Sequence, residues 1–107
     1  MTFSELELLR FVTHVNETGA GQLALHYLRN KEKQEVDFVL CSRNQPVLLI
    51  EAKSTQDAPA KELLSFQKLF NVPAVQLVNK ENVRKIMGPH PKKVLVVTAH
   101  QWLCNLP

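Results

Sequence analysis

The apolar residues at the start of the chain recur with helical spacing. From Phe3 to Val15 they follow one another at intervals of three, with charged residues between them. This pattern predicts an amphipathic helix over residues 3–16. The segment Asn16–Gly21 has the composition of a turn, so it should end that helix.

Three strands are predicted in quick succession after this turn. Residues 22–29 alternate loosely between apolar and polar, residues 35–41 alternate more regularly, and residues 47–54 begin as an apolar run and end with charges. Short polar loops separate the three segments. Connections this short favour an antiparallel meander.

The second half of the chain returns to helical spacing and then to strands. We expect a helix over residues 58–70, a strand over 74–78, a short helix over 79–87 and a last strand over 94–99. Because a helix separates the strands 47–54 and 74–78, these two should be parallel. The element order predicts an α/β domain around a mixed sheet.

Length and composition fit one domain over residues 1–107. The chain has 107 residues, of which 45% are hydrophobic, enough for a modest core. No apolar run approaches the roughly 20 residues of a membrane helix, so we expect no membrane contact. Cys41 and Cys104 are the only cysteines, and both are expected in apolar, strand-like surroundings. A disulfide framework is therefore excluded, and a reduced cytoplasmic protein is the simplest interpretation.

Charge is unevenly distributed along the chain. Residues 1–57 hold six Lys and Arg against eight acids, whereas residues 58–107 hold seven against two. A basic half beside an acidic half is typical of a protein with an anionic partner, here DNA. Ordinary solubilising charge is the alternative. The candidate contacts to a nucleic-acid backbone are Arg84, Lys85, Lys92 and Lys93.

Three charged residues interrupt strands that otherwise appear buried: Asp37, Glu51 and Lys53. A hairpin symmetric about Asn44 would place Asp37 opposite Glu51 and Glu35 opposite Lys53. Two facing carboxylates repel each other, and a divalent cation that prefers oxygen ligands would remove the conflict. The ammonium of Lys53 could then orient a water for attack on a phosphodiester. A plain cross-strand cluster of ion pairs explains the same residues without any chemistry.

The segments EVDFVL (35–40) and LIEAKS (49–54) resemble the core motif of PD-(D/E)XK nucleases. The similarity is closest to an uncharacterised C-terminal domain of prokaryotic AAA-type ATPases. It extends over about residues 5–80 and includes the following matching positions: Tyr27, Arg29, Glu35, Val36, Asp37, Phe38, Val39, Ile50, Glu51 and Lys53.

The resemblance implies a restriction-endonuclease-like α/β fold with a mixed sheet of four to five strands around an αβββαβ core. It also implies that Asp37 and Glu51 bind Mg²⁺ or Mn²⁺, that the backbone carbonyl of Ala52 completes the metal shell, and that Lys53 is the catalytic lysine.

Four further residues are candidate accessory groups. Many related nucleases use a glutamate on the first helix, for which Glu5 and Glu7 are the candidates here. Glu35 is a third. Gln67, on the helix after the lysine strand, is a fourth, although a solvent-facing glutamine is the alternative.

Two functions follow from this resemblance. The leading one is a Mg²⁺-dependent nuclease-type domain that hydrolyses DNA phosphodiesters. The alternative is a catalytically silent module that binds nucleic acid or protein and works with an AAA-type ATPase. The phosphate-binding loop of that ATPase is absent from these 107 residues, so we expect either an excised fragment or a stand-alone relative. A homodimer is a further candidate assembly.

Overall fold

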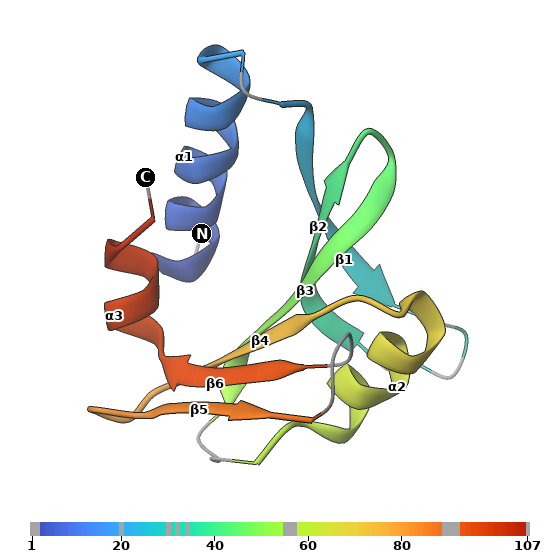
Figure 1. The fold of residues 1–107 in the computed structure, drawn as a ribbon, viewed down its shortest axis with the longest axis vertical. Coiled ribbons are helices and arrows are strands. Elements are labelled where there is room, and N and C mark those ends of the chain that lie inside the picture. Colours follow the sequence, from blue (N-terminus) through green and yellow to red (C-terminus); the bar gives the residue numbers. More distant parts are fainter. Residues whose placement is uncertain are drawn as a thin grey trace.

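The computed structural model shows a twisted mixed sheet with helices on both faces (Figure 1). The structure describes residues 3–19, 21–29, 31, 33, 35–54, 58–88 and 93–106, and for Phe3, Lys53 and Ser54 it describes the backbone alone. Helices α1 (Phe3–Glu17) and α3 (Ala99–Cys104) lie on one face of the sheet, and α2 (Lys61–Phe70) lies on the other. This arrangement confirms the predicted α/β architecture.

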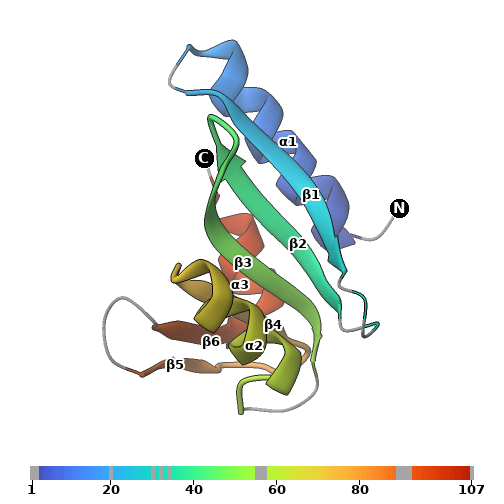
Figure 2. The ribbon, with the colours of Figure 1, turned by 90° about the vertical axis from the view of Figure 1, so that its right-hand side faces the viewer.

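The sheet has six strands in the order β1-β2-β3-β4-β6-β5. Their bounds are β1 (Leu23–Arg29), β2 (Glu35–Ser42), β3 (Gln45–Ser54), β4 (Ala74–Val78), β5 (Arg84–Met87) and β6 (Val94–Thr98). Strands β1, β2 and β3 form the expected antiparallel meander, and β3 and β4 are parallel, as the intervening helix predicted. Figure 2 shows the meander crossing the other strands obliquely, which reflects the ordinary twist of a sheet.

The central strands are apolar on both sides because each side of the sheet has its own core. Leu49 on β3 packs in one cluster with Leu63 and Phe66 of α2. The next residue, Ile50, packs in a second cluster with Leu8 of α1 and with α3. The continuous apolar run of β3 is therefore that of a strand buried on both faces.

The expected helix over residues 79–87 is wrong. Residues Arg84–Met87 form the edge strand β5, which pairs antiparallel with β6, so the sheet has six strands instead of four to five. All four residues of β5 are exposed. The strand has no buried face, so its sequence lacks the alternation of apolar and polar residues that predicts a half-buried strand. The preceding turn is held by Thr98, whose hydroxyl donates to the Lys80 carbonyl and accepts from the Val83 N–H.

The two cysteines differ in their surroundings. Cys41 is buried in β2, as expected, whereas Cys104 is exposed on α3 and not in a strand-like setting. Helix α3 has six residues and no side-chain cap, so its formation depends on the packing of Leu103 into the core. None of the described helices is both long enough and apolar enough to cross a bilayer.

The β2–β3 hairpin reaches the expected register by an unexpected route. Its turn lies at Arg43 and Asn44, both with positive φ, as in a two-residue type I′ turn. A bulge then follows, where β3 steps from Pro46 to Leu48 while β2 moves by one residue. Beyond this bulge the pairs Val39–Leu49 and Phe38–Ile50 match the predicted alignment.

Candidate functional site

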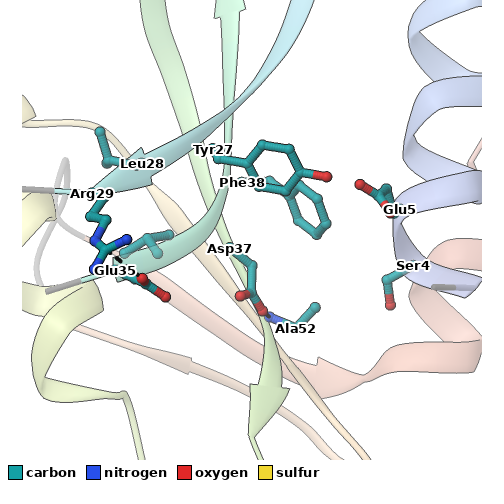
Figure 3. A pocket seen from close by; sticks show the side chains of 10 residues that line it. Ser4, Glu5, Tyr27, Leu28, Arg29, Glu35, Asp37, Phe38 and Ala52 are labelled. Atoms are coloured by element: carbon teal, nitrogen blue, oxygen red, sulfur yellow. Dashed lines mark hydrogen bonds and ion pairs between the residues drawn. The ribbon is translucent and has the colours of Figure 1, made fainter. Parts of the chain in front are cut away.

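A cavity of about 470 Å³ lies between the first turn of α1 and the ends of the hairpin strands (Figure 3). Its walls combine acidic and apolar side chains. The lining residues are Ser4, Glu5, Tyr27, Leu28, Arg29, Glu35, Val36, Asp37, Phe38 and Ala52.

The carboxylates of Asp37 and Glu51 converge on one backbone group. The Ala52 N–H donates to Asp37 Oδ2 at 3.0 Å and to Glu51 Oε1 at 3.2 Å. Both acids are only half-buried. The structure thus brings together two of the three residues in the predicted catalytic set, and it orients both toward the same nitrogen.

Register irregularities on both sides of the acid pair shape this part of the sheet. Between β1 and β2, the pairing steps from His26–Val39 to Leu28–Val36, so that Asp37 and Phe38 together oppose Tyr27. Between β3 and β4, the register also shifts after Glu51. Bulges redirect side chains and interrupt the ladder, and here they occur on both strands that carry the motif.

The first helix supplies one acid to the cavity. Glu5 lines it, and Figure 3 shows the Glu5 carboxylate and the Tyr27 hydroxyl pointing toward each other across it. Glu7 lies elsewhere: its carboxylate binds Arg10 at 3.1 Å and lines a separate hollow along α1. Of the two helix glutamates considered from the sequence, Glu5 is the one near Asp37.

Glu35 lies at the rim of the cavity and forms an ion pair there. Its Oε1 lies 3.4 Å from Arg29 Nε on β1, and both side chains are more than half exposed. Such exposed pairs contribute little to stability. The expected partner, Lys53, is the third member of the predicted catalytic set. Its backbone lies in β3 two residues after Glu51, and its side chain is outside the description.

Gln67 occupies neither of its two expected positions. It is 2% exposed, and its Nε2 donates to the Lys93 carbonyl at 2.9 Å, at the start of β6. The solvent-facing interpretation is therefore wrong. This hydrogen bond links α2 to the start of β6. Gln67 does not line the cavity that Asp37 lines.

Gln76 is a buried polar residue that the sequence interpretation missed. It lies beside Glu51 in the β3–β4 pairing and is 0% exposed. Its Oε1 accepts from the Ala60 N–H and its Nε2 donates to the Ala58 carbonyl, both at 2.7 Å. Gln76 thus anchors the segment that leads from the motif strand into α2. A glutamine inside the otherwise apolar strand AVQLV was the available signal.

The predicted nucleic-acid contacts lie away from this cavity. Arg84 and Lys85 are exposed on β5, at the opposite edge of the sheet from β1. Lys93 is exposed just before β6, and Lys92 falls outside the described residues.

The donors fit a hard divalent cation. Mg²⁺ is commonly held by one or two carboxylates while it keeps several waters, and Asp37 and Glu51 provide such a pair. Within the described ranges, no group of three or more His, Cys, Asp or Glu residues is arranged to hold a metal. A cation would therefore depend on these two carboxylates, with water, a backbone carbonyl or a phosphate supplying its other ligands.

Comparison with known proteins identifies a family without an assigned activity. A family model described as a domain of unknown function (DUF4143) matches residues 8–100. No curated protein and no solved structure matches the chain.

Proposed function

The chain belongs to the DUF4143 family, and we propose that it is a Mg²⁺- or Mn²⁺-dependent nuclease-type domain that hydrolyses DNA phosphodiesters. The observation that carries this proposal is the convergence of Asp37 and Glu51 on the Ala52 N–H. Two carboxylates that meet without a cation repel each other, so an arrangement that holds them together suits a cation site. On the same basis we propose that the sheet is of the restriction-endonuclease-like kind.

Each residue of the motif has a distinct task in this proposal. Asp37 and Glu51 hold the cation, and Ala52 fixes the orientation of both carboxylates through its N–H. Lys53 orients the attacking water and balances charge on the phosphate. The cation would supply positive charge at the phosphate. In hydrolysis, the water oxygen bonds to phosphorus as the water gives up a proton to solvent, the P–O bond to the leaving group breaks, and the leaving oxygen takes up a proton from solvent.

A second candidate function is a silent module that binds nucleic acid or protein and works with an AAA-type ATPase. The observation that favours it is that Glu5, although it lines the same cavity as Asp37, does not join the acid pair as a third metal-binding group in the part of the chain that the structure describes. A site with only two carboxylates would bind a cation weakly in the absence of substrate.

Cleavage of plasmid and branched DNA with Mg²⁺ or Mn²⁺ separates the two candidates. Lys53→Ala should abolish cleavage and leave calorimetric metal binding largely unchanged, because the lysine serves the water and the phosphate. Lys61→Ala, at the exposed start of α2, is the matched control and should cut normally. Cleavage that survives Lys53→Ala would refute the catalytic assignment, and a wild-type chain that neither binds metal nor cuts would favour the silent module.

A further inference from the structure

Tyr27 is an aromatic side chain in an unusual position. It is 71% exposed on the edge strand β1, and it is the only tyrosine of the chain. Among the aromatic side chains that the structure describes, the others are buried or half-buried. A single exposed apolar side chain is common at a protein surface, so only the surroundings of the ring can assign a role to it.

One side of the Tyr27 ring contacts the ring of Phe38. Its centroid lies 5.7 Å from that of Phe38, with 38° between the ring planes, and Phe38 is itself buried in the core shared with α1. The bulge that sets Asp37 and Phe38 opposite Tyr27 creates this contact. Phe38 therefore supports one side of Tyr27 and leaves the rest of the ring open.

The open ring and Asp37, one member of the acid pair, line the same cavity. Tyr27, Asp37 and Ala52 all line it (Figure 3). A flat group stacked on Tyr27 would thus lie in the cavity that Asp37 lines, and the proposed function assigns the carboxylate of Asp37 to a cation. The cavity, at about 470 Å³, falls in the ordinary range for small-molecule sites.

We propose that Tyr27 is a stacking platform for an unpaired nucleobase, so that the substrate class is single-stranded or locally unpaired nucleic acid. This inference rests on the proposed nuclease function. A base inside a duplex has both faces covered by its neighbours, whereas an unpaired base can offer a face to an aromatic side chain. Stacking on Tyr27 would bring the adjoining phosphate into the cavity that Asp37 lines.

The first test measures binding of the whole chain to oligonucleotides in Ca²⁺, an oxygen-binding cation that offsets the charge of the two carboxylates, and a gel confirms that the oligonucleotides stay intact. A single-stranded oligothymidylate is compared with an abasic oligomer of equal length, which has the same phosphates and no bases. Tyr27→Ala should weaken binding to the oligothymidylate by about tenfold or more and leave binding to the abasic oligomer unchanged. Tyr27→Phe, which keeps the ring, should retain wild-type affinity.

Leu69→Ala is the matched control, because Leu69 is 72% exposed and lies on α2, outside the cavity. It should bind both oligomers like the wild type. Because the chain has one tyrosine, selective ring labelling gives a single NMR reporter. Its ring signals should shift on addition of oligothymidylate and stay fixed on addition of the abasic oligomer.

The outcomes distinguish this inference from the function on which it rests. If the Tyr27→Ala variant still cuts DNA and binds oligothymidylate as tightly as the wild type, the stacking role is overturned and the nuclease proposal stands. A tyrosine signal that does not move at saturating oligothymidylate would overturn it as well. A wild-type chain that binds neither oligomer and cuts no DNA would overturn both.

Discussion

At the scale of single residues, one backbone N–H organises the candidate site. Ala52 donates to Asp37 and Glu51 together, and a donor shared by two carboxylates offsets part of their repulsion. A neutral amide can compensate two negative charges only partly. This pairing of carboxylates suits the cation that the proposed function assigns to them.

The proposed cation site predicts the behaviour of Asp37→Asn. The amide oxygen can still accept from Ala52, but one negative charge is lost, so Mg²⁺ or Mn²⁺ affinity should fall at least about tenfold while the metal-free fold becomes equally or slightly more stable. Calorimetric titration and urea unfolding without metal measure the two effects. Asp37→Ala removes the acceptor as well and serves as the comparison, expected to unfold about 1 kcal/mol more easily. A metal-free Asp37→Asn that is strongly destabilised would contradict the like-charge interpretation.

The two thiols should react at very different rates. Cys104 is exposed on α3, whereas Cys41 is buried in β2, and burial raises the pKa of the Cys41 thiol. At pH 8 a chromogenic disulfide reagent should therefore label one thiol per chain quickly and the second only after urea is added. Cys104→Ser should remove the fast reaction. Fast labelling of that variant would mean that Cys41 is accessible.

The raised pKa of Cys41 also sets the sign of a pH effect. The unfolded chain releases the thiol proton at lower pH than the folded chain does, so the free energy of unfolding should fall as the pH rises above the ordinary thiol pKa of about 8.5. Comparing wild type with Cys41→Ala between pH 7 and pH 9.5 isolates this contribution. An identical pH dependence in both would remove it.

At the scale of elements, the strands that carry the motif could be predicted and their irregularities could not. Periodicity gave the meander, and the alignment of Val39 with Leu49 is confirmed. The expected turn is centred on Asn44, whereas the turn in the structure is centred between Arg43 and Asn44. A bulge near Pro46 then shifts the pairing by one residue and restores the expected alignment. Without the bulge, Asp37 would face Ile50 and Glu51 would turn to the other side of the sheet. The position of a bulge depends on packing around the whole hairpin, which periodicity does not record.

The two elements that the sequence did not predict are formed by tertiary contacts. Strand β5 is exposed and gains its order from pairing with β6, although its residues have reasonable helix propensity. Helix α3 is too short to be stable alone and forms where Leu103 enters the core. Local patterns are weak predictors for both, because neither element has a complete amphipathic period of its own.

The buried glutamine of β4 predicts a measurable stabilisation of the connection to α2. In Gln76→Leu, the Ala58 carbonyl and the Ala60 N–H lose their side-chain partners, which should lower the free energy of unfolding by about 2 kcal/mol. Urea unfolding measures the loss. Gln22→Leu, at an exposed glutamine just before β1, is the control and should change stability by less than about 0.5 kcal/mol. Equal effects of the two substitutions would show that the Gln76 hydrogen bonds contribute nothing.

At the scale of the whole molecule, the acidic cavity and the basic edge are separated across the sheet. In the sheet order, β4 and β6 lie between β3, which carries Glu51, and β5, which carries Arg84 and Lys85. Three strand spacings correspond to about 14 Å. This distance exceeds the roughly 3.4 Å between neighbouring nucleotides of a stacked strand, so a single nucleotide cannot reach both regions and a longer strand can.

This separation predicts that the contribution of the basic edge depends on ligand length. A double variant with Arg84→Ala and Lys85→Ala should bind a mononucleotide like the wild type but bind a twelve-nucleotide single strand more weakly. Its salt slope should be smaller by about 0.7 for each phosphate that is no longer neutralised. The weakening should be the same for all base sequences, because interactions with phosphates carry no base information. Arg10→Ala, which removes a cation already bound to Glu7 on α1, is the control and should leave the slope unchanged. Affinities measured from 50 to 200 mM salt test this, since a protein that neutralises fewer phosphates releases fewer counterions. An unchanged slope for the twelve-nucleotide strand would show that the nucleic acid does not reach β5. Ordinary solubilising charge would then explain the excess of Lys and Arg in residues 58–107.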